Sequence, residues 1–216
     1  MEEDSSRNNT AMAPYSANDD GWNSPMVPSE GGGRQIQGTL LTFVDKQWFA
    51  GTGKFKEEVP IGTQLIAIAF RQGWKRWKQG DVVEFVTEID GHYPQRNELG
   101  YLDEREWECG PDGKPSDPWQ DSREIVLVDP KTFAEYTYCT ATKGGRGEVD
   151  RLKGSVQTAR RFRPGKLPII SLEWKKMSTD FGMKSKPALR IVGWWKPPET
   201  AAAAIAPPIA PNDPPS

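Results

Sequence analysis

The chain has 216 residues, nine Trp, two Cys, one His and a formal net charge of −2. This length fits one domain with flanking segments, or at most two small domains. No apolar run approaches the ~18–20 residues that cross a bilayer, and residues 1–4 (MEED) lack the pattern of a secretory signal, so we expect a cytoplasmic protein without a membrane partner. His92, Cys109 and Cys139 form neither a CxxC pair nor a multi-histidine set, so we expect no zinc site, disulfide framework or cofactor.

The two ends of the chain differ in composition from the part between them. Residues 1–33 hold six acids and one base and are rich in Ser, Asn, Gly and Pro, which predicts a disordered acidic arm. Residues 199–216 are rich in Pro and Ala, which predicts a second disordered tail with extended backbone. The domain between them, residues 34–198, holds 27 bases and 22 acids, so its net charge is +5.

Charge is also divided unevenly within that domain. Residues 81–135 hold 15 acids and five bases, whereas residues 136–198 hold 14 bases and four acids. We expect a basic surface if the fold gathers the basic segments together. The alternative is that these are ordinary solvated charges.

Strand patterns dominate the first half of the domain. Residues 39–44 and 64–70 are short apolar runs, and residues 83–89 alternate between apolar and polar side chains, so each predicts a β-strand. Residues 90–123 are rich in Gly, Pro and acids around scattered aromatic residues. This composition predicts a long ordered excursion with turns.

Bases and tryptophans are interleaved directly after the second of these strands. Trp74 and Trp77 are three positions apart, and Lys75, Arg76 and Lys78 surround them. Aromatic rings stack on unpaired bases at about 1–3 kcal/mol each, while lysine and arginine neutralise phosphates. On a strand the two tryptophans point to opposite faces unless a bulge intervenes, so we expect one of them in the core. The alternative is that both pack beside a basic loop.

A hairpin and one helix follow. Residues 125–128 and 135–140 flank the turn sequence DPKT at residues 129–132, which predicts a β-hairpin. A helix is predicted from near Gly147 to just before Pro164, and its apolar stripe is expected to pack on a sheet. That stripe consists of Val149, Leu152, Val156, Ala159 and Phe162.

The glycine-rich stretch before this helix is a candidate anion site. Lys143, Gly144, Gly145 and Arg146 lie between the hairpin and the helix. A glycine-rich turn that enters a helix exposes backbone N–H groups at the positive end of the helix dipole, where a phosphate would bind. The alternative is a flexible connection whose bases face water.

Two more strands are predicted near residues 169–174 and 188–194. Tryptophan next to lysine recurs at their ends, and Lys175, Trp195 and Lys196 complete the candidate binding residues. Several antiparallel strands, one packed helix and two further strands predict a mainly β fold, with an OB-like β-barrel as the expected architecture.

Four short motifs resemble those of small proteins encoded by bacteriophages and prophages. They are LGYLD at residues 99–103, DPWQ at 117–120, TKGGRG at 142–147 and IVGW at 191–194. The likeness covers roughly residues 38–196 and implies a phage-encoded protein inside a bacterial host cell. It supplies no catalytic residue.

We therefore expect non-catalytic binding of single-stranded nucleic acid, with DNA favoured, in phage replication or recombination. The acidic arm is expected to compete for the binding groove or to recruit a partner, and phage or host replication proteins are candidate partners of the tails. One alternative is a protein interaction module centred on Trp107 and Trp119. Another is a metal-dependent nuclease, which needs carboxylates that converge near the basic rim.

Overall fold

The computed structural model describes residues 36–87, 89, 92–110, 113–179 and 182–197. The predicted arm and tail, residues 1–33 and 199–216, lie outside the described residues.

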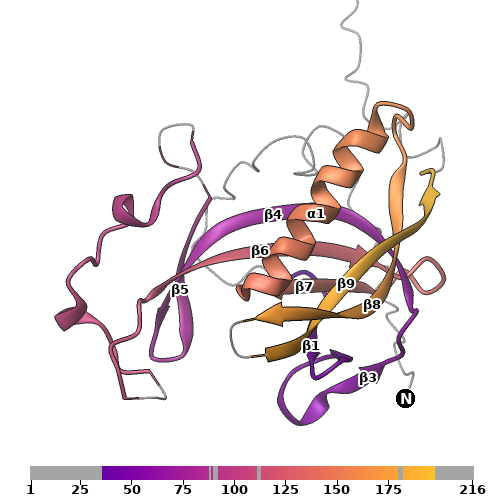
Figure 1. Ribbon diagram of the computed structural model, residues 1–216. Helices are drawn as coiled ribbons and strands as arrows, with labels where there is room; N and C mark the ends of the chain where they lie inside the picture. The colour runs from indigo at the N-terminus through magenta and orange to yellow at the C-terminus, as the bar shows by residue number, and fades with distance from the viewer. Residues whose placement is uncertain (1–35, 88, 90–91, 111–112, 180–181, 198–216) are drawn as a thin grey trace, which may run out of the picture.

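The described residues form one nine-stranded sheet and a single α-helix (Figure 1). The sheet order is β3-β2-β1-β7-β6-β4-β8-β9, with β5 paired to β4, and the β1–β7 pairing is parallel. The sheet curls into a half-barrel, so the prediction of a mainly β fold with one helix is confirmed. The strands are β1 Thr39–Val44, β2 Gln47–Ala50, β3 Glu57–Val59, β4 Gln64–Lys78, β5 Asp81–Val86, β6 Trp119–Val128, β7 Glu135–Thr140, β8 Leu167–Thr179 and β9 Gly182–Trp195.

Strand β4 connects the apolar core to the candidate binding residues. It runs for 15 residues and pairs with β8 at its start, with β5 at its end and with β6 along most of its length. The predicted strand 64–70 and the basic, aromatic stretch that follows it are therefore one continuous strand. A register shift between Ala67 and Ala69 in the β4–β6 pairing introduces an irregularity, which increases the local twist.

The core lies between the sheet and the helix α1, Lys143–Arg160. Val149, Leu152 and Val156 of α1 are fully buried, as the predicted stripe requires, and they join a cluster that includes side chains of β4, β6, β8 and β9. The indole N–H of Trp48 on β2 donates to the Glu173 carbonyl oxygen on β8 at 3.0 Å. This bond links two strands that are far apart in the sheet order, so it helps to hold the curl.

The helix begins four residues earlier than predicted. Thr142 is its N-cap, and the Thr142 hydroxyl accepts a hydrogen bond from the backbone N–H of Gly145 at 3.1 Å. Threonine is a favoured N-cap residue, whereas the glycines after it indicated a turn. Phe162, predicted as part of the stripe, lies beyond the last helical residue and is 83% exposed.

A long excursion separates β5 from β6 and contains the short 3₁₀ helices Arg96–Glu98 and Glu104–Glu106. It ends earlier than predicted because β6 already begins at Trp119. A third 3₁₀ helix, Gly53–Phe55, precedes β3. Among the described residues, no helix combines the length and the apolar character needed to cross a membrane.

Candidate nucleic-acid interface

A cleft of about 300 Å³ lies where β4, β6 and the start of α1 meet. Trp74 and Arg146 both line it, although they come from two segments that the sequence singled out separately. The structure therefore brings an indole ring and a guanidinium group to one open site. The lining residues are Trp74, Gln120, Asp121, Ala141 and Arg146.

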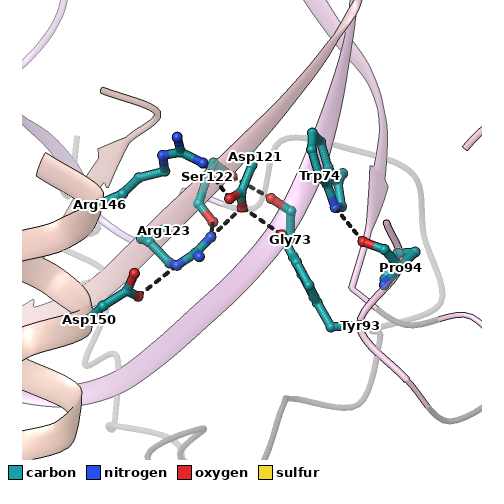
Figure 2. Close-up of polar contacts among 9 residues, drawn as sticks. All are labelled: Gly73, Trp74, Tyr93, Pro94, Asp121, Ser122, Arg123, Arg146 and Asp150. Carbon is teal, nitrogen blue, oxygen red and sulfur yellow. Dashed lines mark hydrogen bonds and ion pairs between the residues drawn. The ribbon is translucent and has the colours of Figure 1, made fainter. Parts of the chain in front are cut away.

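The Trp74 ring is held in place by two neighbours from the excursion. Its Nε1–H donates to the Pro94 carbonyl oxygen at 2.8 Å, and the ring stacks on Tyr93 with centroids 6.4 Å apart (Figure 2). The Tyr93 hydroxyl in turn donates to the Asp121 carboxylate at 2.6 Å. A ring fixed in this way loses little further freedom when a ligand stacks on it.

Asp121 accepts hydrogen bonds from three side chains at the floor of the cleft. Besides Tyr93, Arg123 and Arg146 both pair with this carboxylate, and Arg123 Nε also donates to Asp150 at 2.8 Å (Figure 2). Burial disfavours the charged form of Arg123, but the two carboxylates outweigh it and its pKa is raised. Burial, and then the bond to Asp121, raises the pKa of Tyr93 well above its usual range. Both groups therefore stay protonated and act as donors.

The guanidinium group of Arg146 is only partly covered by the described residues. Its side chain is 32% exposed and pairs with Asp121 through Nη1, while the buried Nε has no hydrogen-bond partner in the described part of the chain. Lys143 is exposed at the first position of α1, and the first turn holds no acidic residue. Cations at a helix N-terminus add to the positive end of the dipole, so this corner would attract an anion.

Glu148 ties the end of the β8–β9 hairpin to the same half of α1. This carboxylate is 1% exposed, accepts a hydrogen bond from Arg151 and lies 2.8 Å from Lys175 Nζ and 3.8 Å from Lys186 Nζ. Burial alone would raise the pKa of Glu148, but Arg151, Lys175 and the Leu189 N–H outweigh it, so the pKa is lowered. Lys175 is therefore at the same end of the molecule as the cleft, with its ammonium group already paired.

Lys75 does not face the cleft, which corrects its predicted contact with a phosphate. The residue is buried, and its Nζ donates to the Glu124 carboxylate and, at 3.1 Å, to Cys139 Sγ. Burial lowers the pKa of Lys75, but Glu124 and Cys139 outweigh it and the pKa is raised. Because side chains alternate along a strand, Lys75 points to the face opposite Trp74.

Gly144 and Gly145 are buried as well, so they do not form the predicted open anion cradle. A Cβ on Gly145 would lie 2.1 Å from Thr140 Oγ1, and one on Gly144 would lie 3.2 Å from the Met177 and Lys186 side chains. The N–H of Gly145 is already used by the Thr142 cap. The two glycines therefore allow the start of α1 to pack closely on β7 and the β8–β9 hairpin.

Arg76, Trp77 and Lys78 line a different groove, of about 470 Å³, between the end of β4 and the excursion. Arg76 pairs with Glu84 at 2.8 Å and lies over the Tyr101 ring. The basic, aromatic stretch of β4 is thus divided between the cleft and this groove. The other groove residues are Gly80, Tyr101, Glu106, Trp107, Glu108, Cys109, Gly110, Ser116, Asp117, Pro118 and Gln120.

Trp119 belongs to the core and is 4% exposed. The alternative of an interaction module centred on Trp107 and Trp119 is therefore wrong about Trp119, because a side chain that is already buried has no surface to offer a partner.

Trp195 and Lys196 lie at the other end of α1 from the cleft. Trp195 pairs with Leu167, whereas Lys175 pairs with Lys186 eight residues further along β8. At about 3.3 Å per strand residue, these positions are roughly 26 Å apart. The two residues therefore do not join Trp74 and Arg146 in one cleft.

The residues that organise the cleft, Tyr93, Asp121 and Arg123, carried no signal in the sequence. Asp121 and Arg123 alternate with Ser122 in a stretch that looked like the end of a loop, and their partners come from distant elements. In the described part of the chain, no group of three or more His, Cys, Asp or Glu side chains is placed to hold a metal ion. The carboxylates of Asp121 and Asp150 are instead bound to arginines.

No protein-family model matches this chain, and no curated protein or solved structure matches it either.

Proposed function

We propose that the protein binds single-stranded nucleic acid without catalysis, at the cleft between Trp74 and Arg146. The observation that carries the proposal is that a fixed indole ring and a partly exposed guanidinium group line the same cleft. A nucleotide presents a planar base and a phosphate side by side, so a ring and a cation at one cleft match its two parts.

Each part of the cleft has a defined role in this proposal. Trp74 stacks on a base, at about 1–3 kcal/mol per stacked base. Arg146 and Lys143 contact the phosphate, with the start of α1 adding the positive end of its dipole. Asp121 positions Arg146 and, through Tyr93, supports the ring. Lys175 adds to the positive potential beside the cleft.

The finer identity of the fold and the cellular role are part of the same proposal. A curled sheet with one helix is compatible with an OB-like barrel, a fold that binds single strands with its curved surface and loops. We extend the proposal to DNA as the favoured ligand and to a role in phage replication or recombination in the cytoplasm of a bacterial host, the setting that the resemblance of the four motifs to phage-encoded proteins implies. Replication proteins of the phage or host are the proposed partners of the two tails.

The first test is a titration of intrinsic tryptophan fluorescence with an unstructured DNA oligonucleotide, at two salt concentrations, with the duplex form as the control. We expect quenching that prefers the single strand and weakens steeply with salt, because bound lysines and arginines release counterions. RNA of the same sequence tests the preference for DNA. Absence of quenching at low salt would overturn the proposal.

Replacement of Arg146 by Gln tests the site itself. We expect Arg146→Gln to weaken binding and to lower the slope of log K against log salt by about 0.7, the value for one phosphate contact on a single strand. The matched control is Arg190→Gln, which removes an exposed arginine that pairs with Glu173 on the β8–β9 ribbon. Equal effects of the two substitutions would show that general charge, and not the cleft, determines binding.

A further inference from the structure

A second basic and aromatic surface lies at the other end of α1. Phe162 is 83% exposed in the turn after the helix, between Arg161 and Arg163, which are also exposed. The sequence between Asp150 and Glu173 holds six bases and no acid. We call these residues the distal patch: Arg161, Phe162, Arg163 and Lys166.

The fold explains the cations of the distal patch but not its aromatic residue. Lysine and arginine are favoured near a helix C-terminus because they compensate the negative end of the dipole. Arg163 also lies over the Trp194 ring, 5.5 Å from its centroid. Phe162, in contrast, leaves most of its ring in water and contributes to the fold chiefly through a backbone N–H bond to Ala159, which any residue except proline could make.

The exposed face of α1 joins the cleft to the distal patch. Lys143 stands at one end of this face and Arg161 at the other, and Gly147 and Gly154 lie exposed between them. A Cβ at either glycine would meet no atom within 4 Å, so the folded chain gives no packing reason for a glycine there. At 1.5 Å per helical residue, the two ends are about 27 Å apart.

We propose that a single strand of nucleic acid runs from the cleft along the exposed face of α1 to the distal patch, where Phe162 stacks on a second base. The inference rests on the proposed function and adds the path of the bound strand and the length of the strand that the protein covers. Charge complementarity supports it at the two ends of the path, where cations stand, because a strand carries a phosphate at every nucleotide. Between them, the exposed Asp150 carboxylate on the same face of α1 is paired with Arg123. At about 3.4 Å per stacked nucleotide, a 27 Å path holds about eight nucleotides, within the range of about 4–16 known for single-strand binding folds.

The path predicts that only a strand long enough to reach Phe162 gains affinity from stacking on its ring. Fluorescence anisotropy of labelled oligothymidylates of about 4 and about 16 nucleotides, the limits of that range, provides the measurement. A longer strand offers one cleft more overlapping binding positions, which alone raises its apparent affinity. We expect the intact protein to bind the longer strand more tightly than this statistical effect predicts. Phe162→Ala should weaken binding of the longer strand by about fivefold or more, the loss of one stacked base, and leave the shorter strand unchanged.

Phe55 supplies a matched control. It is 86% exposed and stands between two lysines, as Phe162 stands between two arginines, but it lies just before β3, far from Phe162 in the sequence. Phe55→Ala should leave both affinities unchanged. Arg161→Gln provides a second variant of the distal patch and should reduce the salt dependence for the longer strand only. Circular dichroism and thermal melting check that each variant folds.

The outcomes separate the path from the cleft. Tight binding of both strands with no effect of Phe162→Ala or Arg161→Gln overturns the path and leaves the cleft intact. Binding of neither strand by the intact protein overturns the proposed function and the path together. Phe162-dependent binding to phosphatidylserine vesicles, with no difference between the two strand lengths, would assign the distal patch to a membrane surface and also overturns the path.

Discussion

The cations that the sequence suggests as phosphate contacts have quite different surroundings in the structure. Lys75 is buried and forms an ion pair with Glu124. In contrast, Lys143 is exposed, and Arg146 pairs with Asp121 while part of its side chain lines the cleft. A charged side chain that is buried without a partner would cost several kcal/mol, so each buried cation here has a carboxylate beside it. A change at Lys75 would therefore act on stability, whereas a change at Arg146 acts on the cleft.

Glu148 is the residue through which pH should act on the fold. Its folded-state pKa is below the unfolded value of 4.5 because Arg151, Lys175 and the Leu189 N–H favour the carboxylate over the effect of burial. A group with a depressed folded pKa stabilises the fold fully above its unfolded pKa and loses that contribution as the pH falls through the folded value. We expect the free energy of unfolding, measured with urea, to decrease below about pH 4.5.

Glu148→Gln isolates this contribution. Near pH 7 we expect the substitution to lower the free energy of unfolding by about 3 kcal/mol, because it leaves the surrounding cations without their buried carboxylate. Its urea midpoint should also fall less between pH 6 and pH 4 than that of the unchanged protein. A parallel decrease in both proteins over this interval would mean that other carboxylates carry the acid sensitivity.

At the scale of elements, the exposed glycines of α1 reduce the stability of the helix. Gly154 has helical backbone and open space around it, so alanine there should raise the free energy of unfolding by about 0.5–1 kcal/mol. Thermal melting and urea titration measure the gain. Gly145→Ala is the matched control and should destabilise the protein, because its Cβ would lie 2.1 Å from Thr140 Oγ1. A loss of stability in Gly154→Ala would contradict the open surroundings of that residue.

Elements with a clear local pattern could be predicted from the sequence, and those defined by distant contacts could not. The strand at residues 39–44 and the hairpin of β6 and β7 have alternating or apolar runs next to turn residues, and the structure contains both. Strands β2 and β3, of four and three residues, are too short to show a period. Strand β2 depends on pairing with β1, and β3 depends on pairing with β2. The start of α1 was placed too late because glycine lowers helix propensity, although here it permits close packing.

The same distinction applies to the candidate site. Trp74, Lys143 and Arg146 were singled out because interleaved aromatic and basic residues form a local pattern. Asp121 and Tyr93 could not be found in this way, since their role depends on the pairing of β4 with β6 and on the return of the excursion to Trp74. A local pattern identifies residue types that can bind, and the tertiary structure determines which of them share one cleft.

At the scale of the whole molecule, the cleft forms where two basic segments of the chain meet. Trp74 comes from residues 34–80, which hold eight bases and three acids, and Arg146 comes from residues 136–198, which hold 14 bases and four acids. The acidic segment between them supplies Asp121, whose carboxylate is compensated by two arginines. The whole-chain charge of −2 therefore does not describe the surface near the cleft, because residues 1–33 alone hold six acids and one base.

This charge division leads to a prediction about residues 1–33. Their removal changes the net charge from −2 to +3. A segment of 33 residues can extend over about 100 Å. It can therefore reach the cleft, because Asp121 in the cleft lies only roughly 23 Å along β6 from Val128, which pairs with the start of β7. The described chain starts beside the beginning of β7, where Thr137 Oγ1 donates to the Gln37 carbonyl oxygen.

If the acidic arm competes with phosphates for the cleft, its deletion should tighten binding of single-stranded DNA and make the binding more sensitive to salt, because no arm has to be displaced. Titration of the full chain and of residues 34–216 at two salt concentrations measures both effects. The same affinity and the same salt dependence in the two proteins would exclude autoinhibition by the arm and leave recruitment of a partner as its role.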